Sequence, residues 1–374
     1  MGNEMQLTDE RILKLNLIQE DLRSSRSGKL YVFGASANAR VITSFITNNS
    51  DLSAEAYVLD DAYFTEETFL EKPVLKLSVF LNIVTENDWI IINNLKDQRA
   101  KELQKEMPSF VRLAYLHVPY STDGVWLNIP FYQQHKKLYE NVRGILSDDI
   151  SKQTMDAFTK GCITGNTEDL YGLHPNAEGQ YFNELTSSCK PGCFVDCGAY
   201  TGDTIKSAFD FLGDRIERII AFEPDSANMI RLKEQMKEIG LAADKVKLLQ
   251  KGSYDKAAML RFKSTSTGLG SAIAEDGDVA IETETLDNAA SDMGTVAFIK
   301  MDIEGSELKS LLGAANTIRK YHPILAICAY HRPEDLFELP EAIRKITGDS
   351  GYRYYLRYHG PGLLELVLYA IPVD

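Results

Sequence analysis

The sequence predicts an α/β protein made of two units, each with a mostly parallel sheet. Two apolar runs, residues 29–34 and 193–198, lead into a glycine-bearing turn and then into a helical pattern. Later apolar runs alternate with helical patterns, and that alternation is typical of parallel sheets. A chain of 374 residues has room for about two or three domains. We expect a smaller α/β domain over residues 1–130 and a larger domain over 131–374.

In the first unit, short apolar runs predict three strands and one helix before a helical bridge. The expected elements are a strand at 29–34, a turn at 35–38, a helix at 39–48, a strand at 56–59 that ends in Asp60 and Asp61, and a strand at 88–93. Residues 130–160 read as helical, with a cap at 147–149. Gly161 is expected to end this bridge between the two units.

The second unit contains more runs that predict strands, and polar side chains follow directly after several of them. The expected elements are strands at 193–198, 219–222, 296–301 and 324–330, a helix at 306–320, and a closing hairpin of 352–358 and 363–371. Ligands of such sheets bind at the carboxyl ends of the strands. Asp302 and Glu304 follow one of these strands, and His331 and Arg332 follow another, so we expect them at one edge.

Composition and charge exclude several classes of function. The formal net charge is −14 and no basic patch stands apart, so nucleic acid is not an expected partner. The first ten residues do not resemble an export signal, and no apolar run is long enough to span a membrane. Three of the five cysteines, Cys189, Cys193 and Cys197, lie close together, but their spacing fits no metal motif. We expect a cytoplasmic protein with reduced cysteines and no metal.

The turn after residues 193–197 carries the first ligand signal. Asp196 precedes Gly198 and Gly202, and Glu223 ends the next strand. This order is that of a nucleotide-type site, in which a carboxylate accepts hydrogen bonds from ribose hydroxyls. The turn lacks the middle glycine of the dinucleotide fingerprint and adds an acid, which argues against NAD. S-adenosylmethionine, with a ribose, no phosphate and a cationic amino-acid end, fits better.

A resemblance to a known family rests on motifs in the last third of the chain. The run Phe-Ile-Lys-Met-Asp-Ile-Glu-Gly-Ser-Glu-Leu at 298–308 is followed by Leu-Gly-Ala at 312–314, Pro323, Tyr-His at 330–331 and Asp-Leu at 335–336. In this order the motifs resemble the FkbM family of S-adenosylmethionine-dependent methyltransferases. The likeness covers the chain from about residue 180 onward. The first unit more weakly resembles half-Rossmann domains fused to glycan-modifying enzymes.

The resemblance implies a Rossmann-like methyltransferase sheet, mostly parallel with an antiparallel C-terminal hairpin. It implies O-methylation of a hydroxyl on a sugar, a polysaccharide precursor or a related small molecule. In this reading the turn from Asp196 to Thr204 holds the methionine part of the donor through Asp196, Gly198, Ala199, Gly202 and Thr204. Glu223 holds the ribose, and Asp302 lies under the sulfur.

Other side chains complete the expected site. Tyr181, beside Phe182, is a candidate lid over the sulfonium. His331 is the expected general base because a histidine titrates near neutrality, and Asp302 is its electrostatic partner. Glu304, Arg332 and His174 are candidates for contact with the acceptor.

Two other functions stay open at this stage. One is an NAD-dependent oxidoreductase using Gly34 or Gly198, and the other is a non-catalytic protein that binds S-adenosylmethionine or a nucleotide sugar. The sequence leaves the acceptor and the oligomeric state open, a homodimer being one candidate.

Overall fold

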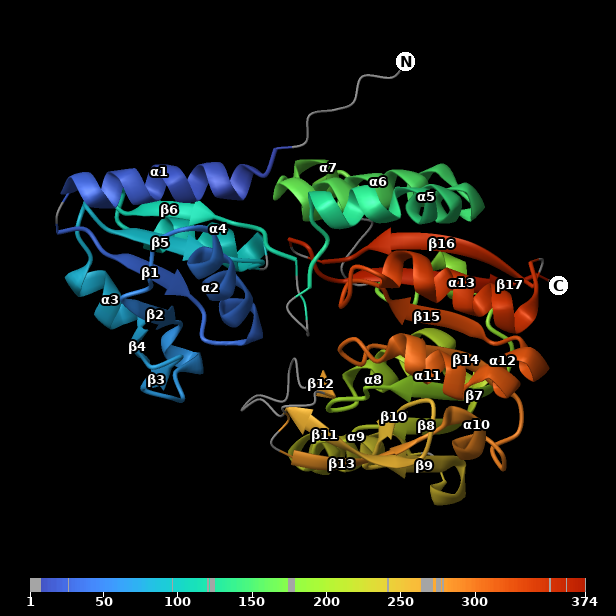
Figure 1. The fold of residues 1–374 in the computed structure, drawn as a ribbon. Helices are drawn as coiled ribbons and strands as arrows, with labels where there is room; N and C mark the ends of the chain where they lie inside the picture. The colour runs from blue at the N-terminus through green and yellow to red at the C-terminus, as the bar shows by residue number, and fades with distance from the viewer. Residues whose placement is uncertain are drawn as a thin grey trace, which may run out of the picture.

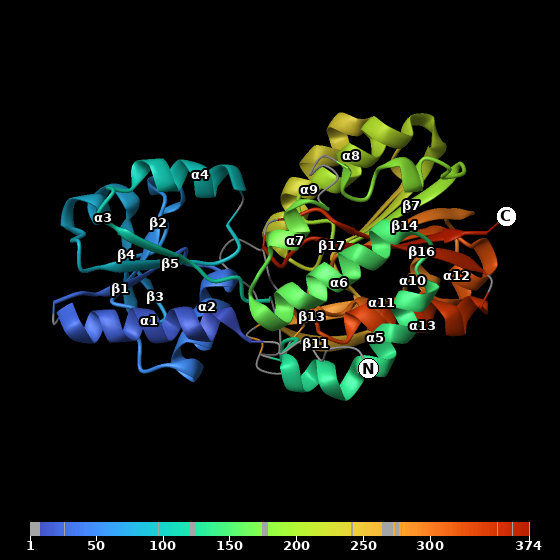
Figure 2. The ribbon, with the colours of Figure 1, turned by 90° about the horizontal axis from the view of Figure 1, so that it is seen from above.

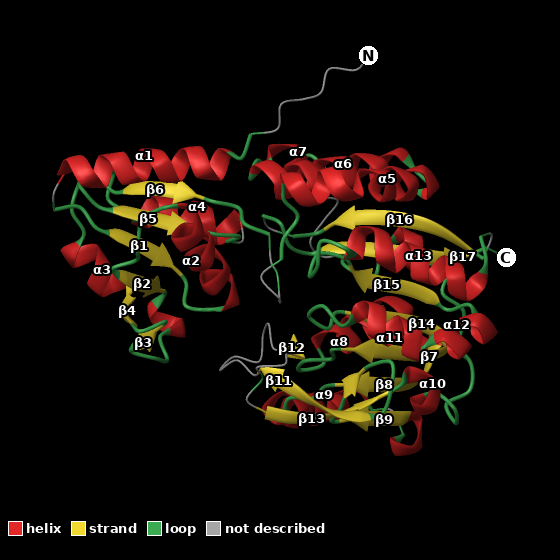
Figure 3. Ribbon diagram, viewed as in Figure 1, coloured by secondary structure: helices red, strands yellow, loops and turns green. Residues whose placement is uncertain are grey.

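The structure is a computed structural model with two large sheets, one in each half of the chain (Figure 1). It describes residues 8–25, 27–95, 97–119, 121, 125–173, 179–240, 242–263, 272–273, 277, 279–349, 351–360 and 362–373. Strands and helices alternate in both halves, and helices cover the sheets (Figure 3). The predicted α/β class is confirmed.

The first sheet has six strands within the described residues, in the order β3-β4-β2-β1-β5-β6. All its pairs are parallel except β3 with β4. The strands are β1 (Leu30–Phe33), β2 (Ala56–Leu59), β3 (Thr68–Phe69), β4 (Lys72–Lys76), β5 (Trp89–Ile92) and β6 (Arg112–Tyr115). The three strands expected from the sequence are present, with ends shifted by at most two residues.

Four helices cover the two faces of this sheet. They are α1 (Glu10–Ser25), α2 (Ala37–Asn49), α3 (Leu77–Ile83) and α4 (Asp97–Glu106), with the short η1 (Asp61–Tyr63) after β2. Leu15 of α1 and Phe45 of α2 belong to the core on one face. Phe80 of α3 and Leu103 of α4 belong to the core on the other. The first unit is therefore a three-layer α/β unit.

A helical bridge leads to the second sheet, as predicted, and lies along its edge strand (Figure 2). It consists of α5 (Ile129–Ile145), α6 (Asp149–Thr164) and α7 (Glu168–Tyr171). Asp148 caps α6 by accepting a hydrogen bond from the Ser151 N–H, as expected. The predicted end at Gly161 is wrong. Helix α6 continues to Thr164, and Gly165, with a positive φ of 78°, is its C-cap. Gly161 lies inside the helix, where Leu363 packs closely against it.

The second sheet has seven strands within the described residues, in the order β16-β17-β15-β14-β7-β8-β9. Six of these strands run in one direction, and β17 runs in the opposite direction between β16 and β15. The strands are β7 (Gly192–Cys197), β8 (Ile216–Phe222), β9 (Val246–Leu249), β14 (Val296–Met301), β15 (Ile324–Cys328), β16 (Tyr352–Tyr358) and β17 (Leu366–Pro372). This is the predicted mostly parallel sheet with a closing antiparallel hairpin.

Helices pack on both faces of this sheet, and a small sheet lies beside it. The helices are η3 (Glu184–Thr186), α8 (Asp203–Leu212), η4 (Gly213–Arg215), α9 (Ser226–Ile239), η5 (Ala243–Lys245), α10 (Leu286–Ala289), α11 (Glu307–Gly313), α12 (Ala315–Tyr321) and α13 (Asp335–Thr347). The small sheet contains β10 (Gly252–Ser253), β11 (Ala258–Lys263), β12 (Ala272–Ile273) and β13 (Val279–Glu284). The single helix predicted over 306–320 is wrong, because the chain breaks at Ala314 into α11 and α12.

The carboxyl edges of the two large sheets face each other. Asn94, just after β5, accepts a hydrogen bond from the N–H of Leu363 through its Oδ1, at 3.2 Å. Leu363 lies in the loop after β16, which runs parallel to β15. In Figure 1 the arrowheads of β1 and β16 accordingly point toward each other.

Within the described residues, no helix combines the length and the apolar character that crossing a membrane requires. All five cysteines are buried, and all five carry free thiols.

Candidate active site

The carboxyl ends of β7, β8, β14 and β15 bring the candidate residues to one edge of the second sheet. The N–H of Gly198, after β7, donates to the carbonyl of Phe222 at the end of β8. The N–H of Asp302, after β14, donates to the carbonyl of Cys197 at the end of β7. These bonds hold the three strand ends side by side, and β15 adds His331 on the other side of β14.

The turn after β7 depends on glycine for a local reason. Gly198 has a φ of +83°, and a Cβ there would lie 2.0 Å from the carbonyl oxygen of Asp302. Gly202 has a φ of +91° and begins α8. The carbonyl group of Asp302, at the end of a neighbouring strand, therefore leaves no room for a side chain at residue 198. Ala199 is fully buried, and Thr204 lies half-buried in the first turn of α8.

Glu223 is fixed at the end of β8 by two backbone groups. Its Oε2 accepts from the N–H of Tyr200 and its Oε1 from the N–H of Asp225, both at 2.8 Å. Only 6% of the residue is exposed. Burial raises the pKa of Glu223 to about 7, although the two backbone hydrogen bonds pull it down. The carboxyl group is therefore near its midpoint of ionisation at neutral pH.

Asp196 lies beneath this edge and is paired with a lysine. It is fully buried, and its Oδ1 lies 3.0 Å from Nζ of Lys300, its cross-strand neighbour on β14. Lys300 also donates to the carbonyl of Gly198 at 2.8 Å. Burial raises the pKa of Asp196 to about 6, in spite of the neighbouring ammonium group. The ion pair between Asp196 and Lys300 therefore supports the turn after β7 from its buried side.

Asp302 is half-buried and held by Tyr181. The phenol of Tyr181 donates to Oδ2 of Asp302 at 3.1 Å, and Nζ of Lys300 lies 5.6 Å from the centre of the tyrosine ring. Burial opposes ionisation of Asp302, but Lys300 and His331 outweigh it and lower its pKa. Asp302 is therefore a carboxylate at neutral pH. The ring of Tyr181, expected as a lid, already faces one cation, Lys300.

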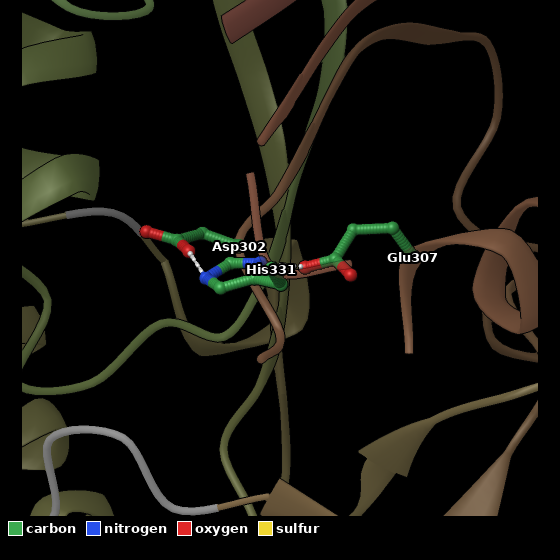
Figure 4. Close-up of side chains that lie close together, drawn as sticks. All are labelled: Asp302, Glu307 and His331. Carbon is green, nitrogen blue, oxygen red and sulfur yellow. Dashed lines mark hydrogen bonds and ion pairs between the residues drawn. The ribbon is translucent and has the colours of Figure 1, made fainter. Parts of the chain in front are cut away.

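His331 is fully buried among three carboxylates, two of which, Asp302 and Glu307, are drawn in Figure 4. Its Nδ1 lies 2.9 Å from Oε1 of Glu307, and its Nε2 lies 3.5 Å from Oδ1 of Asp302 and 3.6 Å from Oε2 of Glu304. Burial disfavours the charged ring, yet Glu307, Glu304 and Asp302 prevail and hold the pKa of His331 well above its usual value. The expectation that this histidine titrates near neutrality is wrong, because it did not include these neighbours.

The structure thus brings together some of the expected site residues but not all. Asp302, Glu304, His331 and Tyr181 meet at one place, and Glu223 ends the strand two positions away in the sheet. Arg332 points away from them, with its Nε 3.8 Å from Glu334 and 42% of its side chain exposed. His174 lies outside the described residues.

This edge lies within a segment of the chain that matches a known family model. The model is that of the methyltransferase FkbM domain, and it matches residues 196–354, from the last residues of β7 to the middle of β16. Residues 196–354 are a methyltransferase FkbM domain. The protein is therefore a methyltransferase, as the resemblance implied.

One solved structure shows the same fold over nearly the whole chain. The structure of a methyltransferase FkbM from Methylobacillus flagellatus KT has a TM-score of 0.64 and 22% identity, covering 96% of this chain and 100% of that one. A putative rRNA methylase from Clostridium thermocellum has a TM-score of 0.36 and 9% identity, covering 53% of this chain and 97% of that one. The comparison with curated proteins found no match.

Sequence reasoning missed two residues of the FkbM domain, Lys300 and Glu307. Lys300 had a detectable signal, because it lies two residues before Asp302 on one strand and so projects from the same face. Glu307 is in the run 298–308, but its carboxylate reaches His331 only because β14 and β15 are neighbours. Its role depends on strand order, which the sequence does not state.

Proposed function

We propose that the FkbM domain transfers a methyl group from S-adenosylmethionine to a hydroxyl group of a sugar, a glycan precursor or a related small molecule. The observation that carries this proposal is the placement of two carboxylates, Glu223 and Asp302, on either side of the turn that follows β7. One suits the ribose of the donor and the other its sulfonium.

The donor would lie across this turn. Glu223 is already oriented by two backbone N–H groups and retains acceptor capacity on both oxygens for ribose hydroxyls. Asp302, a partly exposed carboxylate, offers negative charge near the sulfonium. In this proposal Asp196 supports the methionine end indirectly, since its carboxylate pairs with Lys300 under the turn.

The acceptor would approach from the side of the first sheet. A small cavity there is lined by residues of both units, among them Trp126, Tyr330 and Arg332. It has room for about one water molecule, so it marks a place where the two units meet and is too small for a sugar ring. Of the candidates for acceptor contact, Glu304 lies beside His331 and Arg332 lines this cavity.

The reaction moves a methyl group in one displacement. The C–S bond breaks as the C–O bond forms, the sulfur keeps the electron pair and becomes a neutral thioether, and the hydroxyl loses its proton. A histidine with a raised pKa keeps its own proton near neutrality and is a poor base. We therefore assign His331 to positioning Asp302 and Glu304. The hydroxyl then needs a neighbouring group that lowers its pKa.

Ligand binding followed by product analysis tests the proposal. S-adenosylmethionine and S-adenosylhomocysteine should raise the melting temperature, because a ligand at a hundred times its Kd adds about 2.7 kcal/mol of stability. NAD should leave it unchanged. With a panel of nucleotide sugars and glycans, S-adenosylhomocysteine should form only when a hydroxyl acceptor is present.

Each alternative function gives its own outcome in the same experiment. Stabilisation by NAD and not by S-adenosylmethionine would indicate an oxidoreductase. Donor binding with no product from any hydroxyl acceptor would indicate a non-catalytic binding protein.

A further inference from the structure

The cluster around His331 has the composition and geometry of a metal site. We propose that Asp302, Glu304 and His331 bind one divalent cation, with Glu307 as the group that orients the histidine. The proposal is independent of the cysteines, none of which belongs to this cluster.

Two contacts of the His331 ring suit ligands of a common metal ion. Nε2 of His331 lies 3.5 Å from Oδ1 of Asp302 and 3.6 Å from Oε2 of Glu304. Metal–ligand bonds of about 2.0–2.2 Å place neighbouring ligand atoms roughly 3 to 3.5 Å apart. Both carboxylates are partly exposed, so rotation of their side chains would bring one oxygen of each to the same ion.

Glu307 gives a second, separate indication. It is fully buried, its carboxylate points at the ring of His331, and its Oε1 also accepts from the N–H of Ile303 at 2.8 Å (Figure 4). Its other oxygen, Oε2, is buried without a hydrogen-bond partner among the described residues. A carboxylate on one ring nitrogen fixes the tautomer in which the lone pair of the other nitrogen can bind a metal. Here that nitrogen is Nε2, which faces Asp302 and Glu304.

The charge around the cluster favours a cation. Three carboxylates, those of Asp302, Glu304 and Glu307, surround one imidazole. The nearby ammonium of Lys300 is already paired with Asp196 and bonded to the carbonyl of Gly198. Partly buried negative charge of this kind is costly unless a cation compensates it. A divalent ion bound to Nε2 in place of a ring proton would do so.

The set of ligand atoms also indicates which metal ion would bind and what the ion would do. One imidazole nitrogen with two carboxylate oxygens suits Mn²⁺, Fe²⁺ or Zn²⁺ better than Mg²⁺, which prefers oxygen. Asp302 and Glu304 expose 27% and 24% of their side chains, so further ligands can enter from solvent. This step rests on the proposed function: one of these further ligands is the hydroxyl group of the acceptor. The ion lowers the pKa of that hydroxyl, and the hydroxyl proton leaves to water.

Binding of Mn²⁺ to the full-length protein tests the proposal without any need for turnover. MnCl2 is titrated into the protein, and free Mn²⁺ is measured by its electron paramagnetic resonance signal. We expect one ion per chain. Glu304→Gln and His331→Asn should weaken binding at least about tenfold, and Glu307→Gln by roughly 10- to 100-fold, as for other groups that orient a ligand. Glu341→Gln, an exposed acid of α13, should bind Mn²⁺ like the unchanged protein.

Two controls separate this proposal from the proposed function. Calorimetry with S-adenosylhomocysteine on the same samples reports the donor site, and thermal melts report folding. A protein that binds S-adenosylhomocysteine but no Mn²⁺ overturns the metal site alone. A protein that binds Mn²⁺ but no S-adenosylhomocysteine keeps the metal site and overturns the methyl donor. Equal Mn²⁺ affinity of folded Glu304→Gln and the unchanged protein would also overturn this site.

Discussion

The side chain of Arg11 occupies the space that a side chain at Gly165 would fill. A Cβ at residue 165 would lie 2.5 Å from Cγ of Arg11, and the φ of Gly165 is +78°. Arg11 is almost fully buried and donates to the carbonyls of Cys162 at 2.9 Å and His117 at 3.0 Å. The first helix is thereby bonded to the C-terminal end of α6, where a cation is favoured by the helix dipole.

Arg11→Ala should destabilise the protein by roughly 2 kcal/mol, because it leaves buried carbonyls without their charged donor. Denaturant unfolding measures the change. Arg23→Ala is the control, since Arg23 pairs with Asp51 at an exposed site and should change stability little. Equal effects of the two variants would show that Arg11 does not bond the units together.

Lys300→Met should cost about 3 to 5 kcal/mol, because it leaves the carboxylate of Asp196 buried without its partner. The double variant Lys300→Met with Asp196→Asn should recover part of that loss. Chemical denaturation of the single and double variants gives the coupling energy. An additive result would mean that the two side chains do not stabilise each other.

Donor affinity should rise between about pH 6 and pH 8 as Glu223, with its pKa near 7, becomes a carboxylate that accepts from ribose. The same raised pKa has the opposite effect on stability. The stability that this raised pKa contributes is fully present below pH 4.5, the pKa of Glu223 in the unfolded chain, and is lost as the pH rises through 7. Glu223→Gln should remove both dependences, as calorimetry with S-adenosylhomocysteine and melts across this pH range would show. A wild-type profile without a step near pH 7 would contradict the assignment.

A fragment of residues 127–374 should fold alone and bind the donor. Leu127 belongs to the core of the second sheet, whereas Trp126 packs on the core of the first. Asn128 caps α5 by accepting from the N–H of Phe131, so a fragment that starts at 131 loses that cap, worth about 1 kcal/mol. Cooperative unfolding and binding of S-adenosylhomocysteine check the prediction. An insoluble fragment would argue that the two units fold together.

His331→Asn should lower turnover at least about a hundredfold, because it lets Asp302 and Glu304 move, and should weaken donor affinity much less. The ring holds these two carboxylates in place but lies apart from Glu223, the residue proposed to hold the ribose. Steady-state kinetics and donor calorimetry separate the two effects. His135→Asn, at a half-buried histidine of α5, is the control. Nearly normal turnover in the His331 variant would place the reacting edge elsewhere.

Much of the fold was predictable because the central strands of both large sheets are short apolar runs with a turn at their ends. The strands β2 and β16 begin and end where the sequence places them. The end of α6 was missed because a glycine inside a helix and a glycine at its cap look alike in sequence. Of the two, only Gly165 has a positive φ, and the side chains that pack on them differ, Leu363 on Gly161 and Arg11 on Gly165.

The candidate site was predictable as a set of strand ends but not as a set of charges. Asp302 and His331 were placed together because parallel strands share an edge. The state of His331 could not be predicted, because it depends on Glu307, whose distance from the ring is set by strand order and by the start of α11. Asp196 was expected to face a ligand, and only the pairing of β7 with β14 shows that Lys300 lies across from it.

The hydrogen bond from Leu363 to Asn94 ties the loop after β16 to the edge of the first sheet. The methyltransferase edge is therefore tied to a second body that has its own core. How this edge lies relative to the first sheet depends on the angle between the two bodies. We expect acceptor choice to change through substitutions near Asn94 that alter this angle, with the FkbM domain itself left unchanged.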